Sequence, residues 1–192
     1  ALIHRKEEEA QRIIATDKEI NDLQIDIDER CLRLLATQTP LAVDLRLITS
    51  AMKINADLER VGDQAVNIAE SVLVLLPHPP VKPLIDIPRM AGIAEKMIKD
   101  ALDAFVKRDA QLARDVLRRD DEVDELKDQV FRELLTYMMA DPGTIQRALA
   151  LILISRNLER IADHATNIAE DVIFIVEAKD VRHHADQVAE KP

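Results

Sequence analysis

The same thirteen-residue pattern occurs twice in this chain, as LERVGDQAVNIAE at residues 58–70 and as LERIADHATNIAE at residues 158–170. Nine of the thirteen positions are identical, and two of the other four exchange Val for Ile and Gly for Ala. A repeat this close predicts that the chain contains two copies of one structural unit. Any function must therefore explain why one segment is present twice with the same acidic side chains.

The composition of the 192 residues favours an all-α protein. Hydrophobic residues make up 47% and aromatic residues only 2%, so the chain can bury a core but is poorly suited to β-sheets. The net charge of −10 argues against binding to nucleic acid phosphates. A single cysteine excludes an intrachain disulfide, and no apolar run reaches the ~20 residues of a membrane span. These features predict a cytoplasmic protein.

Proline positions divide the chain. Five of the eight prolines lie in residues 77–88, where they would stop any helix. We expect a first repeat at 1–76, a linker at 77–88, a second repeat at 89–180 and a C-terminal tail at 181–192. Within the repeats, apolar residues recur at spacings of three and four, which indicates helices. The expected helices cover residues 6–38, 41–76, 88–108, 109–140 and 143–180.

Alignment of the two halves indicates that the first one is incomplete. Asp17-x-x-x-Asn21 aligns with Asp120-x-x-x-Asp124, so residue 1 corresponds to residue 104. The second half has a whole helix before that point, and the first half has almost none. We therefore expect two tandem three-helix bundles related by a pseudo-twofold axis, the first lacking its N-terminal helix in this chain. The alternative is a five-helix protein.

The repeated block carries its acidic residues on one side of a helix. At 100° per residue, Glu59, Asp63, Asn67 and Glu70 fall within about 80° of one another. Apolar side chains are interleaved on the same face, so this face should pack against a neighbouring helix. A second arc is interpreted as the solvated face. It includes Lys53, Asp57, Arg60, Gln64 and Ser71 in the first repeat, and Arg160, His164 and Asp171 in the second.

In each repeat a preceding helix supplies more acidic or amide residues. If the helices are antiparallel, Asp17 and Asn21 should face the first block, and Asp120 and Asp124 the second. A buried carboxylate needs a partner, which could be an arginine or lysine, a proton or a metal ion. Oxygen-only ligands suit hard cations and carboxylate-bridged iron. The candidate metal ligands are Asp17, Asn21, Glu59 and Asp63 in the first repeat, and Asp120, Asp124, Glu159 and Asp163 in the second. The alternative is that these acids are only solvated or salt-bridged surface residues.

These residues together resemble the PhoU family. The resemblance rests on the duplicated block LER-[IV]-[GA]-D-x-A-x-NIAE and the upstream D-x-x-x-[ND] motifs, and it extends from Ala1 to the RHH segment at 182–184. It implies two three-helix bundles with metal clusters on E/D-x-x-x-D motifs, and the ions could be iron, manganese, magnesium or zinc. Asn21 departs from the motif, which weakens the cluster expected in the first repeat and leaves the second as the stronger site.

The resemblance also implies a role in phosphate signalling. Such a protein would be a cytoplasmic, non-enzymatic negative regulator that links the ATPase subunit of a phosphate ABC transporter to a sensor histidine kinase. It would reach the membrane only through these partners and would form a homodimer. None of these partners can be identified from the residues alone.

Two other functions remain open at this stage. A di-metal enzyme in a helical bundle would use Glu-x-x-His motifs, but Gly62 and Ala162 stand three residues after the two block glutamates. No nucleophile and base pair or glycine-rich phosphate loop is recognisable either. The other alternative is a metal-free helical scaffold, which a metal-binding assay would distinguish.

Overall fold

The computed structural model describes residues 1–181, which form helices and connecting segments without a β-strand. This confirms the all-α prediction. The end of the predicted tail, including His183 and His184, lies outside the described residues. The helices are α1 (Glu7–Gln38), α2 (Val43–Leu75), α3 (Asp86–Lys107), α4 (Ala110–Leu117), α5 (Asp120–Ala140), the short 3₁₀ helix η1 (Pro142–Thr144) and α6 (Ile145–Glu177).

Local signals set the ends of several helices. Thr39 closes α1 in a left-handed conformation (φ 42°), directly before Pro40, which cannot continue a helix. The Asp109 carboxylate caps α4 by accepting hydrogen bonds from the backbone N–H groups of Gln111 and Leu112, both at 3.0 Å. These caps satisfy backbone groups that a helix end leaves unpaired.

The helix predicted over 109–140 is in fact two helices. A turn at Arg118 and Arg119 separates α4 from α5, although the apolar periodicity continues across it. Basic residues thus follow α4, and three acidic residues occupy the first turn of α5. Both charge placements are favourable for the helix dipoles. Arg119 also forms an ion pair with Asp100 of α3, which holds the turn against a neighbouring helix.

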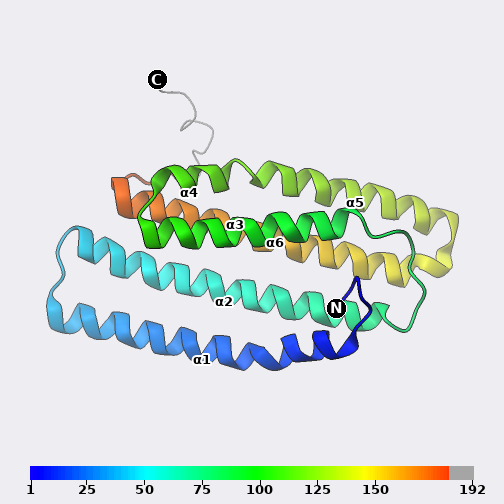
Figure 1. The fold of residues 1–192 in the computed structure, drawn as a ribbon, viewed down its shortest axis with the longest axis horizontal. Coiled ribbons are helices and arrows are strands. Elements are labelled where there is room, and N and C mark those ends of the chain that lie inside the picture. The colour runs from blue at the N-terminus through cyan, green and yellow to red at the C-terminus, as the bar shows by residue number, and fades with distance from the viewer. Residues whose placement is uncertain (182–192) are drawn as a thin grey trace, which may run out of the picture.

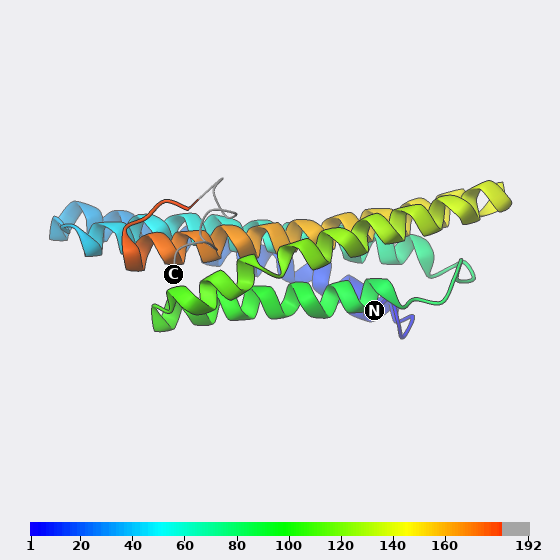
Figure 2. The ribbon, with the colours of Figure 1, turned by 90° about the horizontal axis from the view of Figure 1, so that it is seen from above.

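The helices form two units that are joined by the packing of α2 against α6. α2 lies between α1 and α6, and α6 also packs against α3, α4 and α5 (Figure 1). Seen from above, α3 lies in a different layer from α2 and α6 (Figure 2). The second repeat is therefore a three-helix bundle of α3, α4 with α5, and α6. Within the described part of the first repeat, α1 and α2 have no counterpart of α3, as the alignment of the halves predicted.

The two copies of the repeated block pack against each other. α2 and α6 have 33 residues each and run antiparallel (Figure 1). Lys53 Nζ lies 3.3 Å from Asp171 Oδ1, and Asn167 Nδ2 donates to Asp57 Oδ1 at 3.2 Å. In both contacts the two residues lie at equal and opposite distances along the sequence from the fifth residue of their blocks, Gly62 in the first and Ala162 in the second. This spacing is what a pseudo-twofold axis through the α2–α6 pair requires.

The core is concentrated around α6. Fifteen residues of α6 are buried, but only Ala10 and Cys31 are buried in α1, which packs mainly against α2. The difference is visible at equivalent positions of the block, because Ile168 is fully buried and Ile68 is only half-buried. The second repeat therefore carries most of the hydrophobic stabilisation.

This difference gives a stability prediction. Replacing Ile168 with Ala should lower the free energy of unfolding by about 2–5 kcal/mol, because the lost methyl groups leave a cavity in a closed core. The matched change Ile68→Ala should cost clearly less, since its site is already partly open to solvent. Chemical denaturation of both variants measures the two values. Equal losses would contradict the uneven core.

Candidate functional site

The structure brings the four predicted acids of the second repeat together between α5 and α6. Asp120 and Asp124 lie in the first turns of α5, and Glu159 and Asp163 lie on the facing side of α6. Lys127 of α5 joins the two helices, since its Nζ lies 2.8 Å from Asp124 Oδ1 and 3.0 Å from Glu159 Oε1. We call these four acids the second-repeat cluster.

Proximity and burial change the acidity of this cluster. Partial burial, followed by the charges of Asp163 and Asp124, raises the pKa of Asp120 to about 6. Burial and the charges of Glu159 and Asp124 also raise the pKa of Asp163. The two salt bridges raise the pKa of Lys127 above its usual range, so its ammonium remains charged among the acids. The cluster therefore has excess negative charge that one lysine only partly neutralises.

The corresponding residues of the first repeat lie between α1 and α2. The side chain of Ile20 lies against the Gly62 position, where an added Cβ would be 3.1 Å from Ile20 Cδ1. Asn21 is adjacent to Ile20, and its Nδ2 donates to Asp17 Oδ2 at 3.0 Å. On α2, Arg60 Nη1 lies 3.3 Å from Asp63 Oδ2, and Arg60 Nε lies 3.5 Å from Glu59 Oε2. We call Asp17, Asn21, Glu59 and Asp63 the first-repeat cluster.

Both clusters have the donor chemistry of a metal site but not yet its geometry. Their side chains offer only oxygen ligands, which suits hard cations such as Mg²⁺ and Mn²⁺. Among residues 1–181, however, no group of three His, Cys, Asp or Glu side chains is arranged to hold an ion. In the second-repeat cluster the Lys127 ammonium lies between two of the acids. Binding of an ion would require these side chains to rotate toward one another.

The arc interpreted as solvated is only partly so: Arg60 and Arg160 are exposed, but most of the rest of the arc lies at the interface between the repeats, where that interpretation was wrong. His164 Nδ1 lies 2.8 Å from Asp57 Oδ1, and Gln64 and Asp171 are buried, at 7% and 8% exposure. Lys53 pairs with Asp171 and lies 5.9 Å from the centre of the Phe174 ring. A helical wheel shows two polar arcs on one helix but does not show which arc meets the other copy. The pairing of opposite charges across the copies, Lys53 with Asp171 and Asp57 with His164, was the available signal.

A polar groove follows this interface between α2 and α6. Arg60 of α2 and Arg160 of α6, which are equivalent residues of the two blocks, both line it. Asp163, a member of the second-repeat cluster, lines it as well. The groove therefore borders the second-repeat cluster directly, and it reaches the first-repeat cluster only through Arg60, which pairs with Glu59 and Asp63.

Comparison with known proteins identifies similar chains over almost the whole length. The family model described as the PhoU domain matches residues 1–72 and again residues 87–172. A relative from Caulobacter vibrioides, named phosphate-specific transport system accessory protein PhoU homolog, is 45% identical over 175 residues, which are 91% of this chain and 76% of the relative. A relative with the same name from Aquifex aeolicus is 44% identical over 95% of this chain and 83% of its own length.

Solved structures agree with the sequence matches. The crystal structure of PhoU from Pseudomonas aeruginosa superposes with a TM-score of 0.90 at 42% identity, covering 93% of this chain and 86% of that one. The phosphate transport system regulatory protein PhoU from Streptococcus pneumoniae gives a TM-score of 0.85 at 31% identity, covering 94% and 85%.

The raised pKa of Asp120 gives a prediction about pH. The folded state holds this proton more tightly than the unfolded state does, so stability is highest below about pH 4 for this group and falls as pH rises toward 6. In the presence of a metal chelator at pH 7, the free energy of unfolding of Asp120→Asn should therefore exceed that of the wild type by about 1 kcal/mol, once solvent screening is allowed for. The gain should disappear near pH 4.

The control for this prediction is Asp128→Asn, which removes one charge from an exposed position of the same helix. Thermal unfolding at the two pH values compares the variants. A stabilisation of Asp120→Asn that is the same at pH 4 and pH 7 would show that ionisation of this carboxyl is not its cause.

Proposed function

Because the chain belongs to the PhoU family, we propose that it is a non-enzymatic accessory protein of a phosphate transport system that regulates phosphate uptake and phosphate-starvation signalling. The observation that carries this proposal is the match of the family model to both repeats, together with relatives 44–45% identical that are named as transport accessory proteins. The regulation is negative, and it links the transporter's ATPase subunit to a sensor histidine kinase in the cytoplasm.

The long helices, with an acidic face in each repeat, support an adaptor mechanism. Each described helix is too polar or too short to cross a bilayer, so contact with the membrane would come through partners. The long antiparallel helices offer two related acidic faces, one in each repeat. Two such faces on one rigid body could hold two partners together and raise their effective concentration. A homodimer would double this arrangement.

Metal ions would provide a means of control in this proposal. The first-repeat and second-repeat clusters would bind divalent or ferric ions through their carboxylate oxygens, after side-chain rotation. A bound ion would change an acidic face into a neutral or positive one, and so change which partner surface is complementary. The metal-free scaffold would lack this control, and the partner tests below still apply to it.

The adaptor role predicts direct binding. Purified protein should bind the transporter's ATPase subunit and the cytoplasmic region of the kinase, measured by biolayer interferometry. The quadruple variant E59Q/D63N/E159Q/D163N should bind more weakly, by about tenfold or more, because it removes charge from both faces. The control E8Q/E29Q/E95Q/E125Q removes four exposed acids outside the two clusters and should bind as the wild type does. Wild-type protein that binds neither partner would contradict the proposed function.

The metal proposal makes a separate prediction. Wild-type protein should bind Mn²⁺ in a calorimetric titration, and its melting temperature should rise with Mn²⁺ concentration, because the ion favours the folded state. The paired variants E59Q/D63N and E159Q/D163N should each lose one class of site. If the wild type shows neither heat of binding nor stabilisation with Mn²⁺, Mg²⁺ or Fe²⁺, the clusters are ordinary surface acids.

A further inference from the structure

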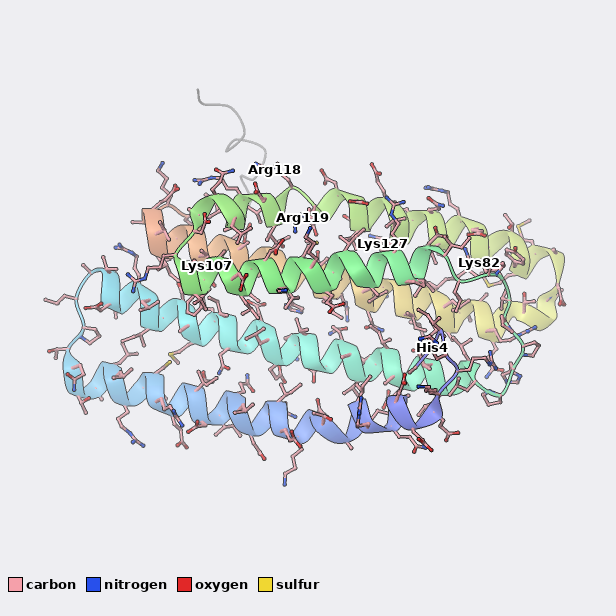
Figure 3. All side chains as sticks on the ribbon, in the orientation of Figure 1. His4, Lys82, Lys107, Arg118, Arg119 and Lys127 are labelled. Atoms are coloured by element: carbon pink, nitrogen blue, oxygen red, sulfur yellow. The ribbon has the colours of Figure 1, made fainter. Side chains whose placement is uncertain are left out.

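A lysine bridges two acids of the second-repeat cluster, one on each of its two helices. The Lys127 ammonium comes from α5 and contacts Asp124 on its own helix and Glu159 on α6. Its side chain is only 29% exposed, and that of Glu159 only 21%. Figure 3 labels Lys127 on the side of α5 that faces the other helices. This cation therefore links the two carboxyl-bearing helices of the second-repeat cluster.

The first-repeat cluster has no equivalent lysine. When Asp17 is aligned with Asp120, the residue at the position of Lys127 is Gln24. Arg60 does contact the acids of the first repeat, but it comes from the same helix as both of them and its side chain is 63% exposed. The first-repeat cluster is thus neutralised from the solvent side, whereas the second is linked by a cation across its two helices.

An ammonium and a divalent cation compete for the same carboxylate oxygens. An ion that bridges α5 and α6 would draw on the four acids of the second-repeat cluster, and two of these, Asp124 and Glu159, are already held by Lys127. An ion could bind there only after the salt bridges break, and it would then have a positive charge close by. Repulsion between the Lys127 ammonium and a divalent ion a few ångströms away in a partly buried site is large enough to change the affinity for the ion by about an order of magnitude.

We propose that Lys127 is an internal counter-cation that closes the second-repeat cluster in the metal-free protein and weakens the binding of divalent ions there. The inference rests on the metal-binding part of the proposed function. On this proposal the two repeats differ in metal affinity for a reason other than the number of acids. The second-repeat cluster has four carboxylates, but it also carries its own cation. Loading of the second site then requires displacement of Lys127 from between α5 and α6.

The test exchanges the residues between the repeats. In the E59Q/D63N background, where only the second-repeat cluster remains, Lys127→Gln should tighten Mn²⁺ binding by about tenfold or more in calorimetry. In the E159Q/D163N background, Gln24→Lys should weaken Mn²⁺ binding at the first-repeat cluster by a similar factor. The control Lys107→Gln removes a lysine that is paired with Asp103 on the exposed face of α3, and it should change nothing.

A second measurement does not depend on the affinity. In chelator, Lys127→Gln should lower the melting temperature, because Asp124 and Glu159 lose their shared partner, and Mn²⁺ should raise it more than in the parent protein. If the parent binds Mn²⁺ and Lys127→Gln binds it no more tightly, the inference is overturned while the proposed function stands. If neither protein binds Mn²⁺, the competition and the metal-binding role are both wrong, and the adaptor role is still decided by the partner-binding measurement.

Discussion

The antiparallel packing of α2 against α6 is the constraint on which the rest of the molecule depends. These helices carry the two copies of the repeated block, and no other pair of long helices joins the first repeat to the second so extensively. Polar contacts fix their register, since Lys53 pairs with Asp171 and Asp57 contacts both His164 and Asn167. A shift of either helix by one residue would separate Asp57, His164 and Asp171 from these partners, and the side chains of these three are largely removed from solvent, so the loss is costly.

The same register determines where the acidic clusters lie. A helix that presents one side to the other repeat must present another to the remaining helix of its own repeat. Glu59 and Asp63 therefore lie toward α1, and Glu159 and Asp163 lie toward α5. The clusters occur on both sides of the α2–α6 pair as a consequence of duplication, and the polar groove between the repeats is lined by Asp163 of one cluster and by Arg60, which pairs with the acids of the other. Any ion or partner that binds one cluster thus acts on a helix that contacts the other repeat.

Sequence patterns predicted the helices well because apolar periodicity follows directly from burial on one side. The proline cluster likewise indicated where α2 ends and α3 begins. Two features could not be read from periodicity. The turn at Arg118 and Arg119 keeps the apolar pattern in phase, so only charges at the helix ends distinguish it from a continuous helix. The polar side of α2 was interpreted as solvated because a wheel ranks hydrophobicity, and a polar interface between two copies of a helix has the composition of a surface.

The candidate site shows the same limit at the level of single residues. Spacing was enough to place four acids on each pair of facing helices, but it did not indicate Lys127, although that residue lies three positions after Asp124 on the same side of α5. The spacing of acidic residues says nothing about a neighbouring lysine. An ammonium among carboxylates nevertheless changes the chemistry of the site more than an additional acid does.

Fusion of the two copies in one chain explains how such differences arise. In a symmetric dimer, each contact near the twofold axis occurs twice with the same residues, so a change on one side is also made on the other. In this chain the two sides are independent. On one side, Asp57 contacts His164. The equivalent residues on the other side are Asn157 and Gln64. Asn157 donates to the Leu153 carbonyl of its own helix, and the Oε1 atom of Gln64 is buried without a described partner. Lys127 and Gln24 are a second case of the same freedom, so the repeats can keep one fold while the chemistry of their acidic faces diverges.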